Sequence, residues 1–329
     1  MPATTTSLAP GGVNAIGRML GLLGDEWNLL ILQQALMGTS RYRHFIDRLP
    51  ISNAVLTSRL RTLCDADLLI RRPGDTGAQR AEYLPTPRSR SLWPVLVCIW
   101  EWERTWVADR AEQLPVMRHR DCGQDFSPLL RCSRCCTRVS LGDVDFRQGP
   151  SGAWDRSAPN AATRRRTERE PAQGQAGLFA ETMSVFGNRW AAALLLSAFL
   201  GTSRFTDFQA QLGAPASVLS ERLQTFCAIG ILRVAPASAA DRTAYLLTDK
   251  GGALIAVLLT ALQWAHRWFR APEGPALEIV HHGCDTALAA ELACGRCGQP
   301  LRGAAVDVIA AQPAATSWNP LRMVSESLT

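Results

Sequence analysis

An internal duplication covers nearly all of the 329 residues of this chain. Gly24-Asp-Glu-Trp27 recurs as Gly187-Asn-Arg-Trp190, and Gly38-Thr-Ser-Arg41 recurs as Gly201-Thr-Ser-Arg204, both at an offset of 163. From Tyr83 onward the matching offset is 162. Each copy therefore has to fold in much the same way, and the chain should contain two similar units joined in tandem.

Within the first copy, the spacing of apolar residues predicts a helix–turn–helix followed by a β-hairpin. Residues 41–49 form a short amphipathic pattern that Pro50 closes, and Ser52 is a suitable N-cap for the next helix. Two short apolar runs around a Pro/Gly-rich turn predict a wing, and a Trp-bearing helix over 91–107 follows. The second copy repeats this order, with Pro215 or Ser217 opening its second helix. We expect a mainly α fold with small β-wings, built from two winged helix–turn–helix domains.

Such domains place the second helix of the motif, the recognition helix, in the major groove of DNA, while the wing contacts the phosphate backbone. The candidate DNA-binding residues are Ser52, Asn53, Thr57, Ser58, Arg59, Arg61, Arg71, Arg72 and Arg80 in the first copy, and Ser217, Ser220, Arg222 and Gln224 in the second. Each could instead be an ordinary exposed helix residue or take part in an ion pair within the fold. Because the second set has fewer basic groups, the second copy is expected to bind DNA weakly or not at all.

A metal-ligand pattern follows the last helix of each copy. The candidate ligands are His119, Cys122, Cys132 and Cys135 in the first copy, and His281, Cys284, Cys294 and Cys297 in the second. Two pairs of ligands, each pair three positions apart, can surround a tetrahedral zinc ion, and Cys₃His is a common structural set. We expect each copy to close its own structural zinc site in a small zinc-ribbon-like module. His282 is an alternative to His281, and Cys136 has no counterpart in the second copy.

The domain boundaries follow from these patterns. We expect winged helices over 13–110 and 177–271, zinc modules over 116–146 and 277–312, and a flexible basic linker over 147–176. The net charge of +6 is carried by the first half and the linker, which permits nucleic-acid binding. No nucleophile–base pair, phosphate loop or open metal site is visible, so an enzyme is not expected. No apolar stretch is long enough to span a bilayer and no signal peptide is visible, so we expect no membrane partner and a cytoplasmic, nucleoid-associated protein with reduced thiols.

Several segments together resemble the HxlR-type winged-helix transcription regulators. The resemblance rests on Gly38-Thr-Ser-Arg-Tyr42, Ile51-Ser-Asn-Ala-Val-Leu-Thr-Ser-Arg-Leu-Arg-Thr-Leu63 and Tyr83-Leu-Pro-Thr86, and on Tyr245-Leu-Leu-Thr-Asp-Lys-Gly251 in the second copy. It implies a bacterial transcription factor that dimerises through its first and last helices and binds an inverted repeat in double-stranded DNA. The cysteine that senses thiol oxidation in some members falls at Asn14 in the first copy and Gly177 in the second, so such sensing is not implied here.

Because the family is usually single-copy, the duplication predicts an intramolecular pseudo-dimer that binds an asymmetric operator. We expect a repressor, with an activator as the alternative. The alternative to a regulator is a protein-interaction scaffold built on winged-helix and zinc-ribbon modules. A small-molecule effector, bound among the tryptophans of the long helices, and pairing of two chains as a homodimer both remain open.

Overall fold

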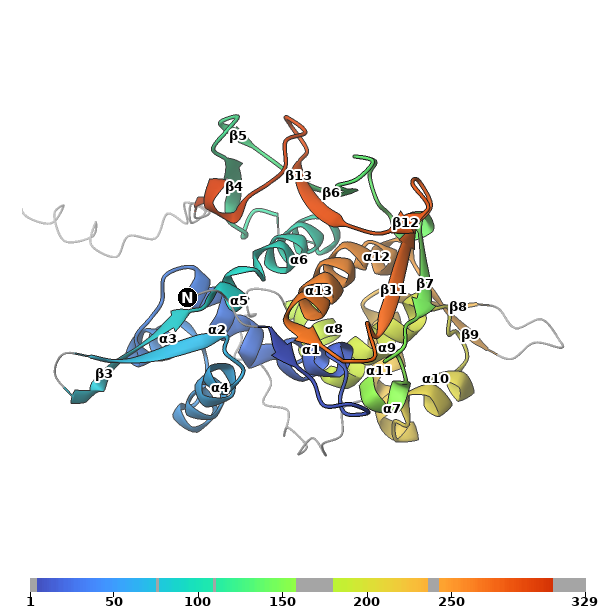
Figure 1. Ribbon diagram of the computed structural model, residues 1–329, viewed down its shortest axis with the longest axis horizontal. Coiled ribbons are helices and arrows are strands. Elements are labelled where there is room, and N and C mark those ends of the chain that lie inside the picture. The colour runs from blue at the N-terminus through green and yellow to red at the C-terminus, as the bar shows by residue number, and fades with distance from the viewer. Residues whose placement is uncertain (1–4, 75–76, 109–110, 158–179, 236–242, 310–329) are drawn as a thin grey trace, which may run out of the picture.

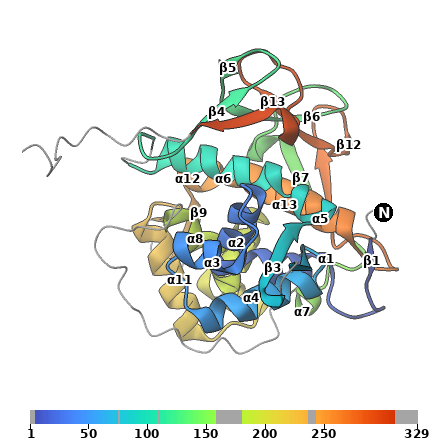
Figure 2. The same ribbon diagram turned by 90° about the vertical axis from the view of Figure 1, so that its left-hand side faces the viewer.

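The first copy forms the predicted winged helix–turn–helix (Figures 1 and 2). The computed structural model describes residues 5–74, 77–108, 111–157, 180–235 and 243–309. The elements of the first copy are α1 (Ala15–Leu23), α2 (Glu26–Leu36), α3 (Tyr42–Arg48), α4 (Asn53–Asp65), β2 (Leu69–Gly74), β3 (Gly77–Pro85), α5 (Pro87–Arg90) and α6 (Trp93–Trp106). Strands β2 and β3 pair antiparallel as the wing.

The second copy repeats the same order of elements. They are α8 (Ala180–Phe186), α9 (Arg189–Phe199), α10 (Phe205–Leu212), α11 (Ala216–Ala228), β8 (Leu232–Ala235), β9 (Ala244–Leu247), α12 (Asp249–Gly252) and α13 (Ile255–Trp268). Strands β8 and β9 pair antiparallel as the second wing. Pro215, not Ser217, is the N-cap of α11.

Local chemistry explains where the recognition helix α4 begins and which face it buries. The Ser52 hydroxyl accepts a hydrogen bond from the backbone N–H of Val55, which satisfies one of the free donors of the first turn. Leu56, Leu60 and Leu63 lie on one face of the helix and are almost completely buried. The opposite face of α4 is left to solvent, and this is the face that the sequence predicted to be available for DNA.

The two copies pack against each other through their first and last helices. In this interface α1 and α6 of the first copy contact α13 of the second. Trp102 donates its indole N–H to the carbonyl of Lys250 at 2.9 Å, and Trp264 donates to the carbonyl of Arg88 at 3.0 Å. Trp264 is the counterpart of Trp102, and Lys250 is the counterpart of Arg88. The copies therefore exchange equivalent contacts, as subunits related by a two-fold axis do.

A layer of strands lies above α6 and α13, on the side of the molecule away from α4 and α11 (Figures 1 and 2). The first copy contributes β4 (Val116–His119), β5 (Gln124–Asp125), β6 (Pro128–Cys132) and β7 (Val144–Gln148). The second contributes β11 (Leu277–His281), β12 (Thr286–Ala287), β13 (Ala290–Cys294) and β14 (Val306–Ile309). Strand β6 pairs with β13, β4 with β14 and β7 with β11, so each of these ladders joins the two copies.

The strand layer has the same two-fold relation as the helices. In the antiparallel pair β6–β13, Leu130 faces its own counterpart Leu292 at the centre of the ladder. The pairing of His119 with Val306 is likewise matched by the pairing of His281 with Val144. The fold is thus a mixture of helix and strand, in which β4–β7 and β11–β14 form one layer shared by the copies and not two separate modules. Apart from this layer, β1 (Thr6–Ser7) pairs in parallel with β10 (Phe269–Arg270).

The prediction of a flexible linker over 147–176 is wrong for residues 147–157, which are ordered parts of the fold. Residues 147 and 148 belong to β7, and α7 (Trp154–Ser157) packs against α1. Asn14, the N-cap of α1, is completely buried and donates hydrogen bonds to the Ser151 carbonyl and the Ser157 hydroxyl. Residues 151–157 pack against the N-terminus of α1 because they supply hydrogen-bond acceptors to the buried Asn14 side chain. The rest of the predicted linker, 158–176, lies outside the described residues.

Among the residues that the structure describes, no helix is both long enough and apolar enough to cross a bilayer.

Candidate functional site

The eight predicted ligands form two compact clusters in the strand layer. The first cluster, which we call site A, contains His119, Cys122, Cys294 and Cys297, and their ligand atoms all lie within 4.8 Å of one another. The His119 Nδ1 atom lies 3.5 Å from the Cys122 Sγ atom and 3.4 Å from the Cys297 Sγ atom. The Cys122 and Cys294 sulfurs are 4.0 Å apart. His119 and Cys294 are buried, whereas Cys122 and Cys297 lie closer to the surface.

The second cluster, site B, has the same composition and takes Cys132, Cys135, His281 and Cys284. Here the His281 Nδ1 atom lies 3.3 Å from the Cys284 Sγ atom and 3.5 Å from the Cys135 Sγ atom. The Cys132 and Cys284 sulfurs are 3.9 Å apart. Both clusters could therefore bind a metal ion.

The spacing of these atoms fits a tetrahedral zinc ion. With Zn–S bonds of about 2.3 Å, two sulfur ligands of a tetrahedral site lie about 3.8 Å apart, close to the separations in both clusters. The protein lowers the pKa of one cysteine in each site and raises that of another: at Cys122 and Cys284, the hydrogen bonds from Gln124 and Thr286 are outweighed by burial and neighbouring thiols. Burial opposes ionisation of Cys132, but hydrogen bonds from the backbone around it lower its pKa to about 6. Hydrogen bonding from the Gln299 backbone helps lower the pKa of Cys297 to about 7. Thiolates are the form in which cysteine binds metal.

The grouping of the ligands differs from the sequence-based expectation. We expected His119 and Cys122 to combine with Cys132 and Cys135 of the same copy. In the structure each site takes its His-x-x-Cys pair from one copy and its Cys-x-x-Cys pair from the other. The reason is the β6–β13 ladder, which carries the end of each strand, and the cysteine pair that follows, toward the histidine pair of the other copy.

Two further residues near the ligands, His282 and Cys136, point away from the clusters. His281 reaches site B, whereas the His282 Nε2 atom lies 3.0 Å from a carboxylate oxygen of Asp145. Cys136 is exposed and has a positive φ of 60°, so the chain turns there and directs it out of site B.

A glycine beside site B gives a direct test of whether the His281 ring must keep its position. A Cβ atom added to Gly283 would lie 2.7 Å from Cε1 of His281, too close for the ring to stay where it is. We expect Gly283→Ala to weaken metal binding at site B by about tenfold, the lower end of effects seen when the orientation of a ligand is disturbed. Competition with a chromogenic chelator measures this. The matched control is Asp121→Ala at the equivalent position of site A, which should leave site B unchanged; equal affinity of Gly283→Ala and wild type at site B would contradict the prediction.

In the first copy, the recognition helix presents most of its predicted residues to solvent. Ser52, Asn53, Thr57, Ser58 and Arg61 are all exposed. This face also includes a residue that the sequence analysis missed. The hydroxyl of Tyr42 on α3 donates a hydrogen bond either to the backbone carbonyl or to the side-chain oxygen of Asn53, at 3.0 and 3.1 Å, and lies 3.1 Å from the Thr57 hydroxyl. The first turn of α4 is thus fixed to the preceding helix.

Arg59 lies differently from the other candidates. Its guanidinium group makes a two-point contact with Asp25, the N-cap of α2, at 2.7 and 3.0 Å, and the side chain is half-buried. This is the intramolecular alternative that the sequence analysis left open for basic residues here. A competing internal carboxylate makes Arg59 a weaker candidate for DNA contact than Arg61.

The recognition helix α11 of the second copy has less basic surface. Ser217 and Gln224 are exposed, whereas Ser220 and Arg222 are partly buried. The Arg222 guanidinium pairs with the neighbouring Glu221 at 3.0 Å. This helix therefore presents mainly neutral polar groups.

The wings are described only in part. Arg71 and Arg72 on β2 are exposed. Arg80 lies in the backbone of β3, but its side chain is outside the described residues, as are residues 236–242 of the second wing.

Comparison with a family model decides how the two helical units are classified. The HxlR-like helix-turn-helix model matches residues 22–111 and again residues 185–273, together more than half of the chain. The chain belongs to the HxlR-like helix-turn-helix family. The two matched segments coincide with the two winged helices described above, so this is a tandem HxlR-type protein, and it is a transcriptional regulator of the helix-turn-helix type.

Curated relatives of this HxlR-type chain are about the length of one copy. An uncharacterized HTH-type transcriptional regulator of Mycobacterium tuberculosis is 34% identical over 137 residues, which cover 41% of this chain and 86% of the relative. A Bacillus subtilis protein described in the same words is 33% identical over 27% of this chain and 85% of its own length. A solved structure of a candidate transcription factor from Pseudomonas aeruginosa is 29% identical, covers 36% of this chain and 80% of that one, and has a TM-score of 0.28.

Proposed function

We propose that this HxlR-type regulator binds a two-part operator in double-stranded DNA as an intramolecular pseudo-dimer. The observation that carries the proposal is the exchange of equivalent contacts between the copies, through Trp102 and Trp264 in the helices and Leu130 and Leu292 in the strands. Recognition helices α4 and α11 lie on the same side of the body, opposite the strand layer (Figures 1 and 2). Two such helices held in a fixed relation can enter major grooves about one helical turn apart.

The operator should be asymmetric, because the two reading surfaces differ. The first offers Arg61 and the exposed wing arginines Arg71 and Arg72, whereas the second offers Ser217 and Gln224 on α11 and one exposed wing arginine, Arg233. Basic groups supply most of the phosphate attraction, so the first copy should dominate affinity and the second should contribute mainly to specificity. Occupation of both grooves would exclude other proteins from the same DNA, and we therefore propose repression. Such a protein would work on the nucleoid in the cytoplasm.

We further propose that sites A and B hold structural zinc. Each cluster supplies four ligands, which leaves no open position for a reacting water molecule. Because each ion would be held by both copies, the zinc ions would fix the copies to each other at the end of the molecule away from the DNA. The metal thereby stabilises the spacing of the two recognition helices.

The test is selection of duplexes from a random DNA pool with the zinc-loaded full chain, followed by binding measurements across salt concentrations. We expect a two-part motif with unlike halves and a log–log salt slope of several units. A one-part motif would show that α11 does not read DNA. Absence of any enriched motif would overturn the proposal in favour of the protein-interaction scaffold.

A further inference from the structure

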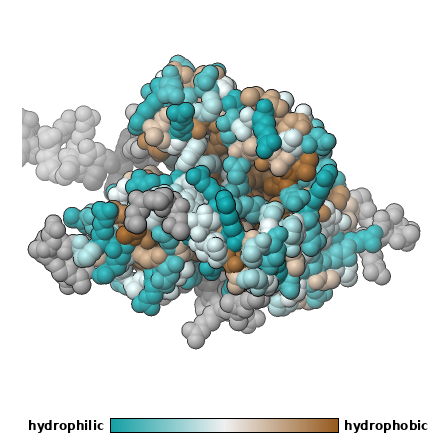
Figure 3. Space-filling model, in the orientation of Figure 1, coloured by the Kyte–Doolittle hydropathy of each residue, from teal (hydrophilic) through white to brown (hydrophobic). Residues whose placement is uncertain are grey.

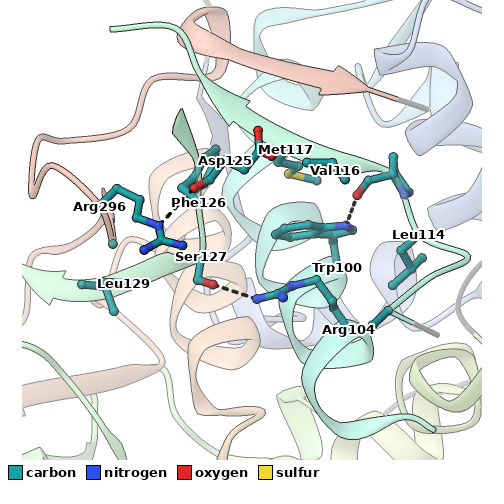
Figure 4. Close-up of a pocket in the computed structure, with 13 residues that line it drawn as sticks. Trp100, Arg104, Leu114, Val116, Met117, Asp125, Phe126, Ser127, Leu129 and Arg296 are labelled. Atoms are coloured by element: carbon teal, nitrogen blue, oxygen red, sulfur yellow. Dashed lines mark hydrogen bonds between the residues drawn. The ribbon is translucent and has the colours of Figure 1, made fainter. Parts of the chain in front are cut away.

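A pocket of about 450 Å³ lies beside site A, between helix α6 and the strand layer (Figure 4). This volume is in the range of small-molecule sites. Its floor is apolar and is formed in part by Trp100, Met117 and Phe126, all of which are buried. The Trp100 indole N–H is already satisfied by the carbonyl of Pro115 at 2.8 Å, and the Arg104 guanidinium lies over the ring at 5.3 Å from its centroid, so the ring lines the pocket without an unpaired donor.

Two guanidinium groups lie at the polar side of the pocket, and they differ in how far they are neutralised. Arg104 contacts both carboxylate oxygens of Glu101 and donates to the Ser127 hydroxyl at 2.7 Å. Arg296 donates to the backbone carbonyl of Asp125 at 3.4 Å and, within the part of the chain that the structure describes, makes no ion pair. The Asp125 carboxylate forms an ion pair with Arg118 at 2.8 Å. Arg296 therefore leaves a positive charge at the edge of an apolar pocket.

The pocket is built by both copies. Trp100 and Arg104 come from the last helix of the first copy, whereas Arg296 lies between the site A ligands Cys294 and Cys297 of the second. The equivalent positions elsewhere in the chain have different chemistry, because the counterparts of Trp100 and Arg104 are Leu262 and His266. The counterpart of Arg296 is again an arginine, Arg134, but the counterpart of Phe126 is Leu288, so the aromatic floor and not the cation is particular to this location.

Figure 3 shows hydrophobic surface between the strand layer and the helices, most of it at the right of the view near α12 and β11, with hydrophilic side chains around it. The combination of aromatic floor and edge cation selects a planar apolar ligand with one negative charge. We propose that this pocket binds a small aromatic carboxylate, with its ring against Trp100, Met117 and Phe126 and its carboxylate on Arg296.

The test is isothermal titration of the metal-loaded full chain with 1-naphthoate, and with 1-naphthamide as the uncharged analogue. We expect binding of the carboxylate and at least about tenfold weaker binding of the amide, because the charge-assisted hydrogen bond is lost. Arg296→Gln should weaken naphthoate binding by a similar factor. The matched control is Arg134→Gln, which changes the counterpart arginine between Cys132 and Cys135 of site B and should leave naphthoate binding unchanged.

Both variants must keep two metal ions per chain, which separates loss of the ligand site from loss of fold. No heat of binding up to about 5 mM naphthoate would overturn the proposal, since that corresponds to less than about 3 kcal/mol of binding free energy. Equal binding of naphthoate and naphthamide, or of naphthoate by Arg296→Gln and Arg134→Gln, would also overturn it. These measurements use no DNA, so their outcome is independent of whether the proposed operator binding holds.

Discussion

A chain carrying both Cys122→Ser and Cys297→Ser is expected to retain one tightly bound metal ion, whereas a chain carrying Cys122→Ser and Cys135→Ser is expected to retain none. The first pair of substitutions removes two ligands from site A and leaves site B complete. The second pair removes one ligand from each site. Each chain loses two cysteines, so the comparison depends only on how the ligands are grouped.

The effect on stability should be large for the second chain. Binding of structural zinc supplies about 10–16 kcal/mol of apparent free energy in zinc-finger peptides, and loss of a thiolate ligand removes much of it. The three strand ladders that join the copies would then lose both metal anchors. We expect the chain with Cys122→Ser and Cys135→Ser to unfold its strand layer at a markedly lower temperature than the chain that keeps site B.

Metal content per chain after gel filtration, measured by mass spectrometry, gives the first readout. Thermal unfolding followed by circular dichroism gives the second, and the helical signal serves as a control that α1–α13 still fold. If the chain with Cys122→Ser and Cys135→Ser kept one ion while the other kept none, each copy would close its own site. That result would contradict the exchanged grouping.

Arg61→Ala is expected to weaken binding to the selected duplex by at least about tenfold, which corresponds to the 1–3 kcal/mol typical of an arginine at a base edge or phosphate. Arg61 is exposed on α4, where the structure shows no carboxylate partner among the described residues. Its counterpart in the second copy is Gln224, so Gln224→Ala removes a neutral side chain from the equivalent position and should cost no more than about threefold.

Arg59→Ala provides the internal comparison on the same helix. Since Arg59 is held by Asp25, its removal should affect DNA affinity less than removal of Arg61 and should lower thermal stability slightly. Fluorescence anisotropy at several salt concentrations would measure all three variants, and a phosphate contact would reduce the salt slope by about one. A greater loss of affinity in Arg59→Ala than in Arg61→Ala would show that the ion pair opens on DNA, contrary to this prediction.

The local structure of each copy could be predicted from sequence because its determinants are local. The leucine spacing in residues 53–65 and the Ser52 N-cap placed α4, and the turn after Pro73 placed the wing. The internal repeat then gave the second copy with no further information. The eight ligand positions were also visible, because they are preserved between the copies while most residues around them differ. The family assignment rests on the same local patterns.

The amino-acid sequence therefore indicates which side chains can bind metal and which helices form, but not which ligands share an ion. Both groupings use the same four His-x-x-Cys and Cys-x-x-Cys pairs with the same spacing, so nothing local distinguishes them. Long-range strand pairing selects one of the two groupings. Strand β6 of the first copy pairs antiparallel with β13 of the second, with Leu130 opposite Leu292. As a result, each strand brings its cysteine pair close to the His-x-x-Cys pair of the other copy. The burial of Asn14 by residues 151–157 and the pocket around Trp100 depend on contacts of the same kind, between residues far apart in the chain.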